Sequence, residues 1–112
     1  MLSTLQTLEA YSGDTTTFAV AVTDGGVAHD LTGRTLSWLV SATRDGATLL
    51  VKDVTVHSNA AAGLSALTLT PEDIETIGGP GSYILTGIEV DGTAEVTRAV
   101  SNLRIRGRPQ RA

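Results

Sequence analysis

Hydrophobic and polar residues alternate with a period of two along most of the chain, which is the pattern of half-buried β-strands. Turn-forming residues separate the alternating segments, and the pairs Asp45-Gly46 and Asp91-Gly92 are typical of tight hairpins. The pattern therefore predicts an all-β chain of about seven short strands, placed within residues 14–22, 27–33, 34–42, 48–57, 64–70, 82–90 and 93–107.

In three of these strands the hydrophobic alternation has features that affect which residues are expected to share a face. The run Leu49–Val51 interrupts the alternation, which predicts a bulge or a segment buried on both faces. In the strand at 82–90 the alternation rests on Ile84, Ile88 and Val90. The last strand is expected to slip in phase near Asn102.

A single short helix is predicted near residues 71–77. The sequence Thr-Pro-Glu-Asp at 70–73 supplies an N-cap, a proline for the first helical position and acidic side chains for the positive end of the helix dipole. Ile74 and Ile77 lie on one face and should close an end of the core. The glycine-rich corner at 78–81 ends the helix after about one turn.

Strands at regular spacing, joined by turns and one helical corner, favour an immunoglobulin-like antiparallel β-sandwich. At 112 residues the chain is expected to form one domain. We place the sandwich at residues 13–106, an N-terminal arm or first strand at 1–12, and a C-terminal tail at 107–112. Trp38 is in phase with hydrophobic neighbours, so we expect it in the core.

The residue types offer few parts for catalysis, so we expect a chain that is not an enzyme and binds no cofactor. There is no cysteine, which leaves out disulfides and thiolate ligands. His29 and His57 lie outside any metal-ligand or triad spacing, and we expect both to be solvated. Glu72, Asp73 and Glu75 could hold a calcium ion, but a helix N-terminus favours the same side chains without a metal, so no metal ligand is assigned.

Charge and hydropathy narrow the classes of partner. The formal net charge is -4, which weighs against sequence-independent binding of nucleic acid. No segment has the length of a membrane-spanning helix, and the N-terminus lacks the pattern of a secretory leader. We therefore expect no nucleic-acid or membrane partner, and synthesis in the cytoplasm of the producing cell.

The two ends of the chain are the candidate partner-binding segments. Residues 1–10 form an apolar segment able to pair with the sheet edge of a neighbour, and residues 104–111 form a basic arm suited to an acidic protein surface. A solvated last strand followed by a flexible tail explains the same arginines without a partner. The candidate residues are Leu2, Leu5, Leu8, Arg104, Arg106, Arg108 and Arg111.

The order of the turn motifs resembles a known family. The chain reads "SGDTTTFAVAV", "DLTGRTLSWLV", "GLSALTLTPEDIETI", "GPGSYILTGIEV" and "DGTAEVTRAVSNLRI" between about Gly13 and Ile105. This series is similar to the N-terminal domain of phage baseplate upper proteins and related phage tail and head-fibre proteins.

The resemblance implies a structural module of a bacteriophage virion, made in the bacterial host cytoplasm. Such a module would attach to the tail, baseplate, head-tail region or capsid surface, with other virion proteins as partners and as a homo-oligomer or in multiple copies. Two alternatives stay open: a small carbohydrate- or host-surface-binding module, and an adhesion domain from a bacterial protein.

Overall fold

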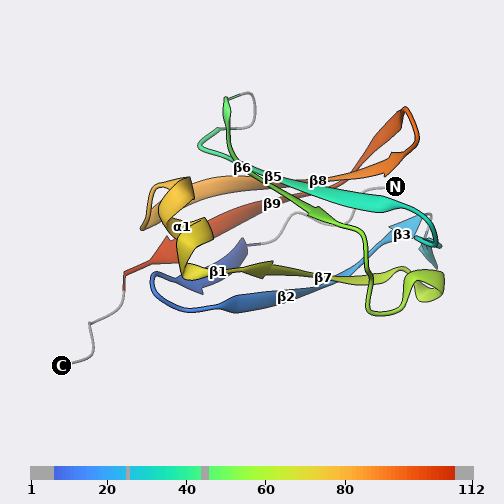
Figure 1. The fold of residues 1–112 in the computed structure, drawn as a ribbon, viewed down its shortest axis with the longest axis horizontal. Helices are drawn as coiled ribbons and strands as arrows, with labels where there is room; N and C mark the ends of the chain where they lie inside the picture. Colours follow the sequence, from blue (N-terminus) through green and yellow to red (C-terminus); the bar gives the residue numbers. More distant parts are fainter. Residues whose placement is uncertain (1–6, 25, 44–45, 108–112) are drawn as a thin grey trace.

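The computed structural model describes residues 7–24, 26–43 and 46–107. Within these ranges seven strands are five residues or longer, and they are joined by one α-helix, a turn of 3-10 helix and a short two-stranded ribbon (Figure 1). The elements are β1 Thr7–Tyr11, β2 Thr16–Ala21, β3 Thr23–Asp24, β4 Val27–Ala28, β5 Thr35–Ser41, β6 Thr48–Val54, η1 Ala60–Ala62, β7 Leu64–Leu69, α1 Pro71–Ile77, β8 Gly81–Asp91 and β9 Ala94–Arg106.

The strands form two layers packed as a sandwich. One layer is a five-stranded sheet in the order β1-β9-β8-β5-β6, and the other is the pair β2-β7 (Figure 1). The pairs within these sheets are antiparallel, as expected, apart from β1 and β9, which run parallel. This parallel pair joins the two ends of the described chain, so the spacing of neighbouring strands could not predict it. The N-terminal segment is therefore a first strand from Thr7 onward.

Two features of the core are typical of immunoglobulin-like sandwiches, and together with the strand order they establish this fold. Trp38 lies buried on β5 between the two sheets. At the corner after α1, the Tyr83 hydroxyl donates a hydrogen bond to the Gly79 carbonyl at 2.9 Å, four residues upstream. This is the tyrosine corner of the fold, and it holds the start of β8 against the helix.

Helix α1 occupies the predicted residues 71–77, although its seven residues make about two turns where about one was expected. The Thr70 hydroxyl accepts from the Asp73 N–H at 3.2 Å, and the Asp73 carboxylate accepts from the Thr70 N–H at 2.9 Å, which completes a capping box. Ile74 and Ile77 are both buried, so the helix closes one end of the core. The 3-10 turn at Ala60–Ala62 lies between the strands predicted at 48–57 and 64–70.

The isoleucines whose alternation marked β8 as a strand lie on its outer face. Leu85, Gly87 and Glu89 are buried, whereas Ile84 and its alternating partners lie half-buried on the outer face. Position 87 faces inward and holds a glycine, because the Trp38 ring fills the space that a side chain would need. Glu89 can be buried because basic side chains surround it, as described below.

The predicted irregularities were placed correctly in one strand and wrongly in another. Leu49 is a bulge, because the pairing of β5 with β6 shifts from Val40–Leu50 to Ser41–Thr48. In β9 the register shift falls at Arg98, not near Asn102. This extra residue turns the Arg98 side chain toward the buried end of β8.

Adding a methyl group at Gly87 should destabilise the fold. A Cβ atom there would lie 2.6 Å from Trp38 Cζ3 and 2.8 Å from Cη2, and the backbone of Gly87 is outside the left-handed region, so the effect is one of packing. We expect Gly87→Ala to lower the free energy of unfolding by about 1–3 kcal/mol in urea denaturation. Gly107→Ala is the matched control, because its Cβ would meet Pro80 Cγ at 3.7 Å. Equal midpoints for the two variants would contradict this packing.

Candidate interaction surface

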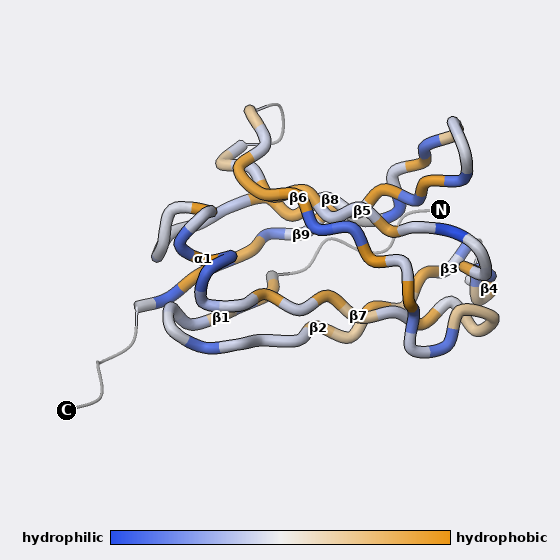
Figure 2. Tube along the Cα trace, in the orientation of Figure 1, coloured by the Kyte–Doolittle hydropathy of each residue, from blue (hydrophilic) through white to orange (hydrophobic). Residues whose placement is uncertain are grey.

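The outer face of the five-stranded sheet is more apolar than the outer side of an antiparallel sheet usually is. Cross-strand pairing places Val51, Leu39, Thr86 and Val100 in one row across β6, β5, β8 and β9. Val51 is 52% exposed and the others are half-buried, so apolar groups meet solvent there. Figure 2 shows the hydrophobic stretch of β6 along this sheet. We define the apolar outer face as Leu39, Leu49, Val51, Ile84, Ile88, Val90 and Val100.

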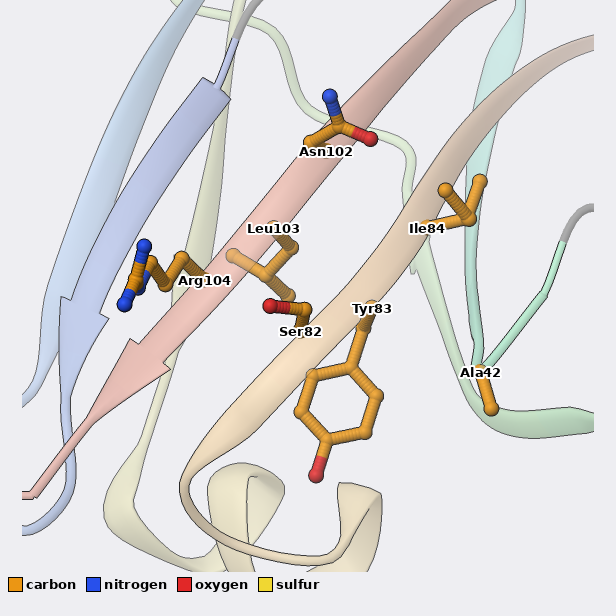
Figure 3. Close-up of a pocket in the computed structure, with 7 residues that line it drawn as sticks. All are labelled: Ala42, Ser82, Tyr83, Ile84, Asn102, Leu103 and Arg104. Atoms are coloured by element: carbon orange, nitrogen blue, oxygen red, sulfur yellow. The ribbon is translucent and has the colours of Figure 1, made fainter.

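An open pocket of about 310 Å³ borders this face at the end of the sheet near α1 (Figure 3). Ser82 pairs with Arg104, and Ile84 pairs with Asn102, so hydroxyl and amide groups lie on the same two strands as an apolar side chain, while the Arg104 guanidinium points away from Ile84 (Figure 3). The pocket is lined by Ala42, Ser82, Tyr83, Ile84, Asn102, Leu103 and Arg104. It offers hydrogen-bond donors at the polar margin of an apolar surface.

The structure separates the arginines that the sequence grouped together. Arg104 is exposed and forms no ion pair within the described residues. Arg106 instead binds Glu9 of β1 through Nε and Nη2, at 3.3 Å and 3.2 Å. Both partners of that pair are exposed, so it contributes little to stability. Arg108 and Arg111 lie outside the described residues.

The apolar residues of the N-terminal segment are likewise divided. Leu8 is half-buried against the core of its own chain, and Ala10 is fully buried. Residues 7–11 pair with β9 of the same molecule, so this part of the segment does not pair with a neighbour here. Leu2 and Leu5 lie outside the described residues.

A second cluster of polar residues lies at the other end of β8, and the sequence reasoning missed it. Glu89 is 2% exposed, and it is the one charged side chain in the buried class among the described residues. Three basic side chains contact the Glu89 carboxylate. Arg98 Nε donates to Glu89 Oε1 at 2.6 Å, Arg34 Nη1 donates to Glu89 Oε2, and His29 Nε2 lies 2.9 Å from Glu89 Oε1. Asp91 adds a weaker contact, 3.7 Å from Arg34 Nη2. We call Glu89, Arg34, Arg98 and His29 the Glu89 cluster.

The surroundings of Glu89 determine its protonation. Burial alone would raise the pKa of this carboxyl, but hydrogen bonds from Arg34, His29 and Arg98 outweigh the burial. The pKa of Glu89 is lowered from 4.5 to about 2. Through these ion pairs the Glu89 cluster connects the segment before β5 to β8 and β9. These segments lie at the end of the sandwich opposite α1 (Figure 1).

This pKa predicts loss of stability in acid. The folded chain holds Glu89 ionised more strongly than the unfolded chain does, so the stabilisation is present above the unfolded pKa and is lost as the pH falls from about 5 toward about 2. At 1.36 kcal/mol per pKa unit the loss is about 3 kcal/mol. Urea midpoints at several pH values measure it. Glu89→Gln should flatten the curve, and an unchanged acid slope in that variant would assign the loss to other groups.

Both histidines are bonded rather than solvated, which corrects the expectation from sequence. His57 Nδ1 lies 2.8 Å from Ser65 Oγ, and Nε2 lies 2.7 Å from the Arg34 carbonyl oxygen, so the imidazole links the two sheets. His29 belongs to the Glu89 cluster. The reason is tertiary: each imidazole sits where two layers meet, which local spacing does not reveal.

The acidic residues at the start of α1 are used by the protein itself. Asp73 accepts from the Thr70 N–H and from Lys52 Nζ, at 2.9 Å and 2.6 Å, so it joins the helix to β6. No group of three or more His, Cys, Asp or Glu placed to bind a metal ion occurs in the described ranges. In the same ranges no helix has the length and hydropathy to cross a membrane.

Comparison with known proteins gives a fold likeness. No protein-family model matches the chain, and no curated protein matches it in sequence. A solved structure of murine CRIg is similar over 97% of this chain and 98% of that chain, with 14% sequence identity and a TM-score of 0.48. This similarity concerns the fold, and no function is carried over from it.

Proposed function

We propose that the chain is a non-enzymatic attachment module that acts through protein–protein contacts in a bacteriophage virion, at the tail, baseplate, head-tail region or capsid surface. The apolar outer face carries the protein-contact part of the proposal, because apolar side chains gather there on the solvent side of a sheet. The virion setting is supported by the resemblance of the turn motifs to phage baseplate and fibre domains.

The proposed partner is another virion protein whose contact surface matches this face. Its centre would carry apolar side chains that cover Val51, Leu39 and their neighbours. At the end of the sheet near α1, the partner would place a carboxylate against Arg104, which has no ion pair within the described residues. Arginine can bind a carboxylate through two parallel hydrogen bonds, in a bidentate pair. A sheet face of this kind suits repeated use in several copies around a particle.

Cosedimentation with particles assembled without this chain tests the proposal. Val51→Lys should weaken binding by at least about tenfold, because a lysine at the centre of an apolar contact loses its hydration. Val51 is half exposed, so folding should be retained, as circular dichroism can verify. Ala61→Lys is the matched control: Ala61 is an exposed residue of the 3-10 turn that leads into β7 of the opposite sheet, and its change should leave binding unchanged.

The alternative is a small module that binds carbohydrate or a host surface, and the pocket beside Arg104 favours it. Its hydroxyl, amide and guanidinium groups could recognise a polar ligand. A glycan array separates the two functions. Binding to a defined glycan that is lost in Asn102→Ala, without cosedimentation, would favour the alternative and remove the attachment proposal.

A further inference from the structure

We propose that the free edge of β2 accepts an extended segment of a partner protein as an added strand. This inference rests on the proposed role in protein–protein attachment, but it concerns a different surface from the apolar outer face. Within the described residues, β2 pairs with β7 along one edge through a continuous six-residue register, and its other edge has no paired strand. Such an edge presents unsatisfied backbone N–H and C=O groups.

The sequence of β2 lacks the devices that usually protect an edge strand. Its residues are Thr-Thr-Phe-Ala-Val-Ala, with no charge, proline or glycine, and its pairing shows no register shift. The edge strands of the other sheet are protected: β1 carries Glu9, and β6 carries Lys52 and Asp53 together with a bulge. Edge-to-edge association is thus opposed at the five-stranded sheet and unopposed at β2.

Among the described residues, side chains on the β2 side of the core are less buried than those on the β7 side. Phe18 and Val20 point inward from β2 but are only half-buried, and so is Leu8 of β1 on the facing sheet. On the neighbouring strand β7, the inward Leu67 and Leu69 are fully buried. An added strand beside β2 would cover the exposed parts of Phe18, Val20 and Leu8.

The opposite side of the sandwich is closed by contacts already described. Lys52 of β6 binds Asp73 of α1, and the helix packs against both β6 and β7. Further along, His57 connects Ser65 of β7 to the chain before β5. These contacts explain why burial differs between the two strands of the small sheet, and they single out the β2 side as the open one.

The backbone defines the occupant as a polypeptide strand, since only an extended chain offers alternating donors and acceptors along the edge. The inward-facing positions of the occupant would be apolar, because they would lie beside Phe18 and Val20. Its outward positions would be small or hydroxylated, to match Thr17 and Ala19. About six residues, or roughly 20 Å of strand, would span β2.

A peptide titration with the full chain tests this inference. The probe is a synthetic peptide of residues 63–70, "GLSALTLT", which contains the strand that already pairs with β2 inside the fold. Its control has the same residues reordered so that the leucines are adjacent. Hydrogen exchange followed by NMR should show new protection at β2 amides with the probe and none with the control. Protection at the β6 edge, at β1 or over the apolar outer face would overturn the inference.

Two variants locate the contact. Val20→Lys places a charge in the open side of the core and should weaken binding of the probe at least tenfold, and Ala19→Lys, which adds a charge to the edge strand itself, should weaken it as well. If Val20→Lys does not fold, the exchange pattern of the unchanged chain decides. Should the probe bind only after residues 1–6 are deleted, the chain itself fills the edge and a partner strand is excluded. Val51→Lys, on the apolar outer face, should bind the probe as the unchanged chain does. The peptide titration and the cosedimentation therefore test different surfaces, and a negative result in the titration does not alter the conclusion from cosedimentation.

Discussion

Glu89→Ala is expected to lower the free energy of unfolding by about 3–5 kcal/mol. The substitution removes the acceptor that Arg98 and Arg34 share and leaves the guanidinium groups without it in a partly buried site. Most of the cost comes from the arginines that lose this close acceptor and not from the lost attraction, because their desolvation is offset less by the longer contacts that remain, Arg98 to Asp24 at 3.9 Å and Arg34 to Asp91 at 3.7 Å. Urea denaturation at neutral pH measures the loss.

Asp91→Ala is the matched control for that measurement. Asp91 lies 3.7 Å from Arg34 Nη2, but it is 60% exposed, so its removal should cost less than about 0.5 kcal/mol. The double variant Glu89→Ala, Arg98→Ala should lose less than the sum of the two single changes, since the first removes the partner of the second. Additive losses, or equal losses from Glu89→Ala and Asp91→Ala, would show that the carboxylate does not hold this end of the sandwich.

The signals that predicted the fold correctly are local ones. The residues at 70–73 each favour a helix start through their own backbone and side-chain chemistry, and α1 begins there and ends at the glycine-rich corner, as predicted. Trp38 was assigned to the core from the two residues that flank it at period two, and it is buried. Local chemistry was sufficient in these cases because tertiary contacts support the same choice.

What could not be predicted depends on contacts between distant segments. The buried residues of β8 were not predicted, because Ile84 and Ile88 look more suitable for a core than Gly87 and Glu89. The Trp38 ring and the arginines reverse that preference, and both lie on other strands. A usable signal was present in Tyr83 and Leu85, which are in phase with Glu89, but a lone carboxylate on an inward face has no local explanation.

The candidate surface was also hidden from the sequence for a tertiary reason. Arg104 and Arg106 are two residues apart and look equivalent, yet Arg106 forms the ion pair with Glu9, which lies on β1 far away in the sequence and stands opposite Arg104 in the strand register. In the same way, the apolar row through Val51 and Leu39 arises from the register of β5 with its two neighbours. Neither arrangement follows from the spacing along a single strand.

Ile77→Asp is expected to be the other large loss, of about 4 kcal/mol or more. Ile77 is buried at the end of α1 that faces the core, and an aspartate there would be ionised without a partner. Ile77→Val separates charge from volume, since it deletes one methylene and should cost about 0.5–1.5 kcal/mol. The fluorescence of Trp38 and urea denaturation both follow the change, because Trp38 belongs to the same core cluster.

Glu75→Ala is the control on the exposed face of the same helix and should change the free energy of unfolding by less than about 0.5 kcal/mol. The helix is held at both ends, by Lys52 on Asp73 and by the Tyr83 hydroxyl on Gly79. Two causes can therefore hold α1 in place: these hydrogen bonds at its ends, and the packing of its buried side chains. Comparing Ile77→Asp with Glu75→Ala separates them. If Ile77→Asp costs no more than Glu75→Ala, the polar contacts alone position the helix, and Ile77 is not part of the core that stabilises the sandwich.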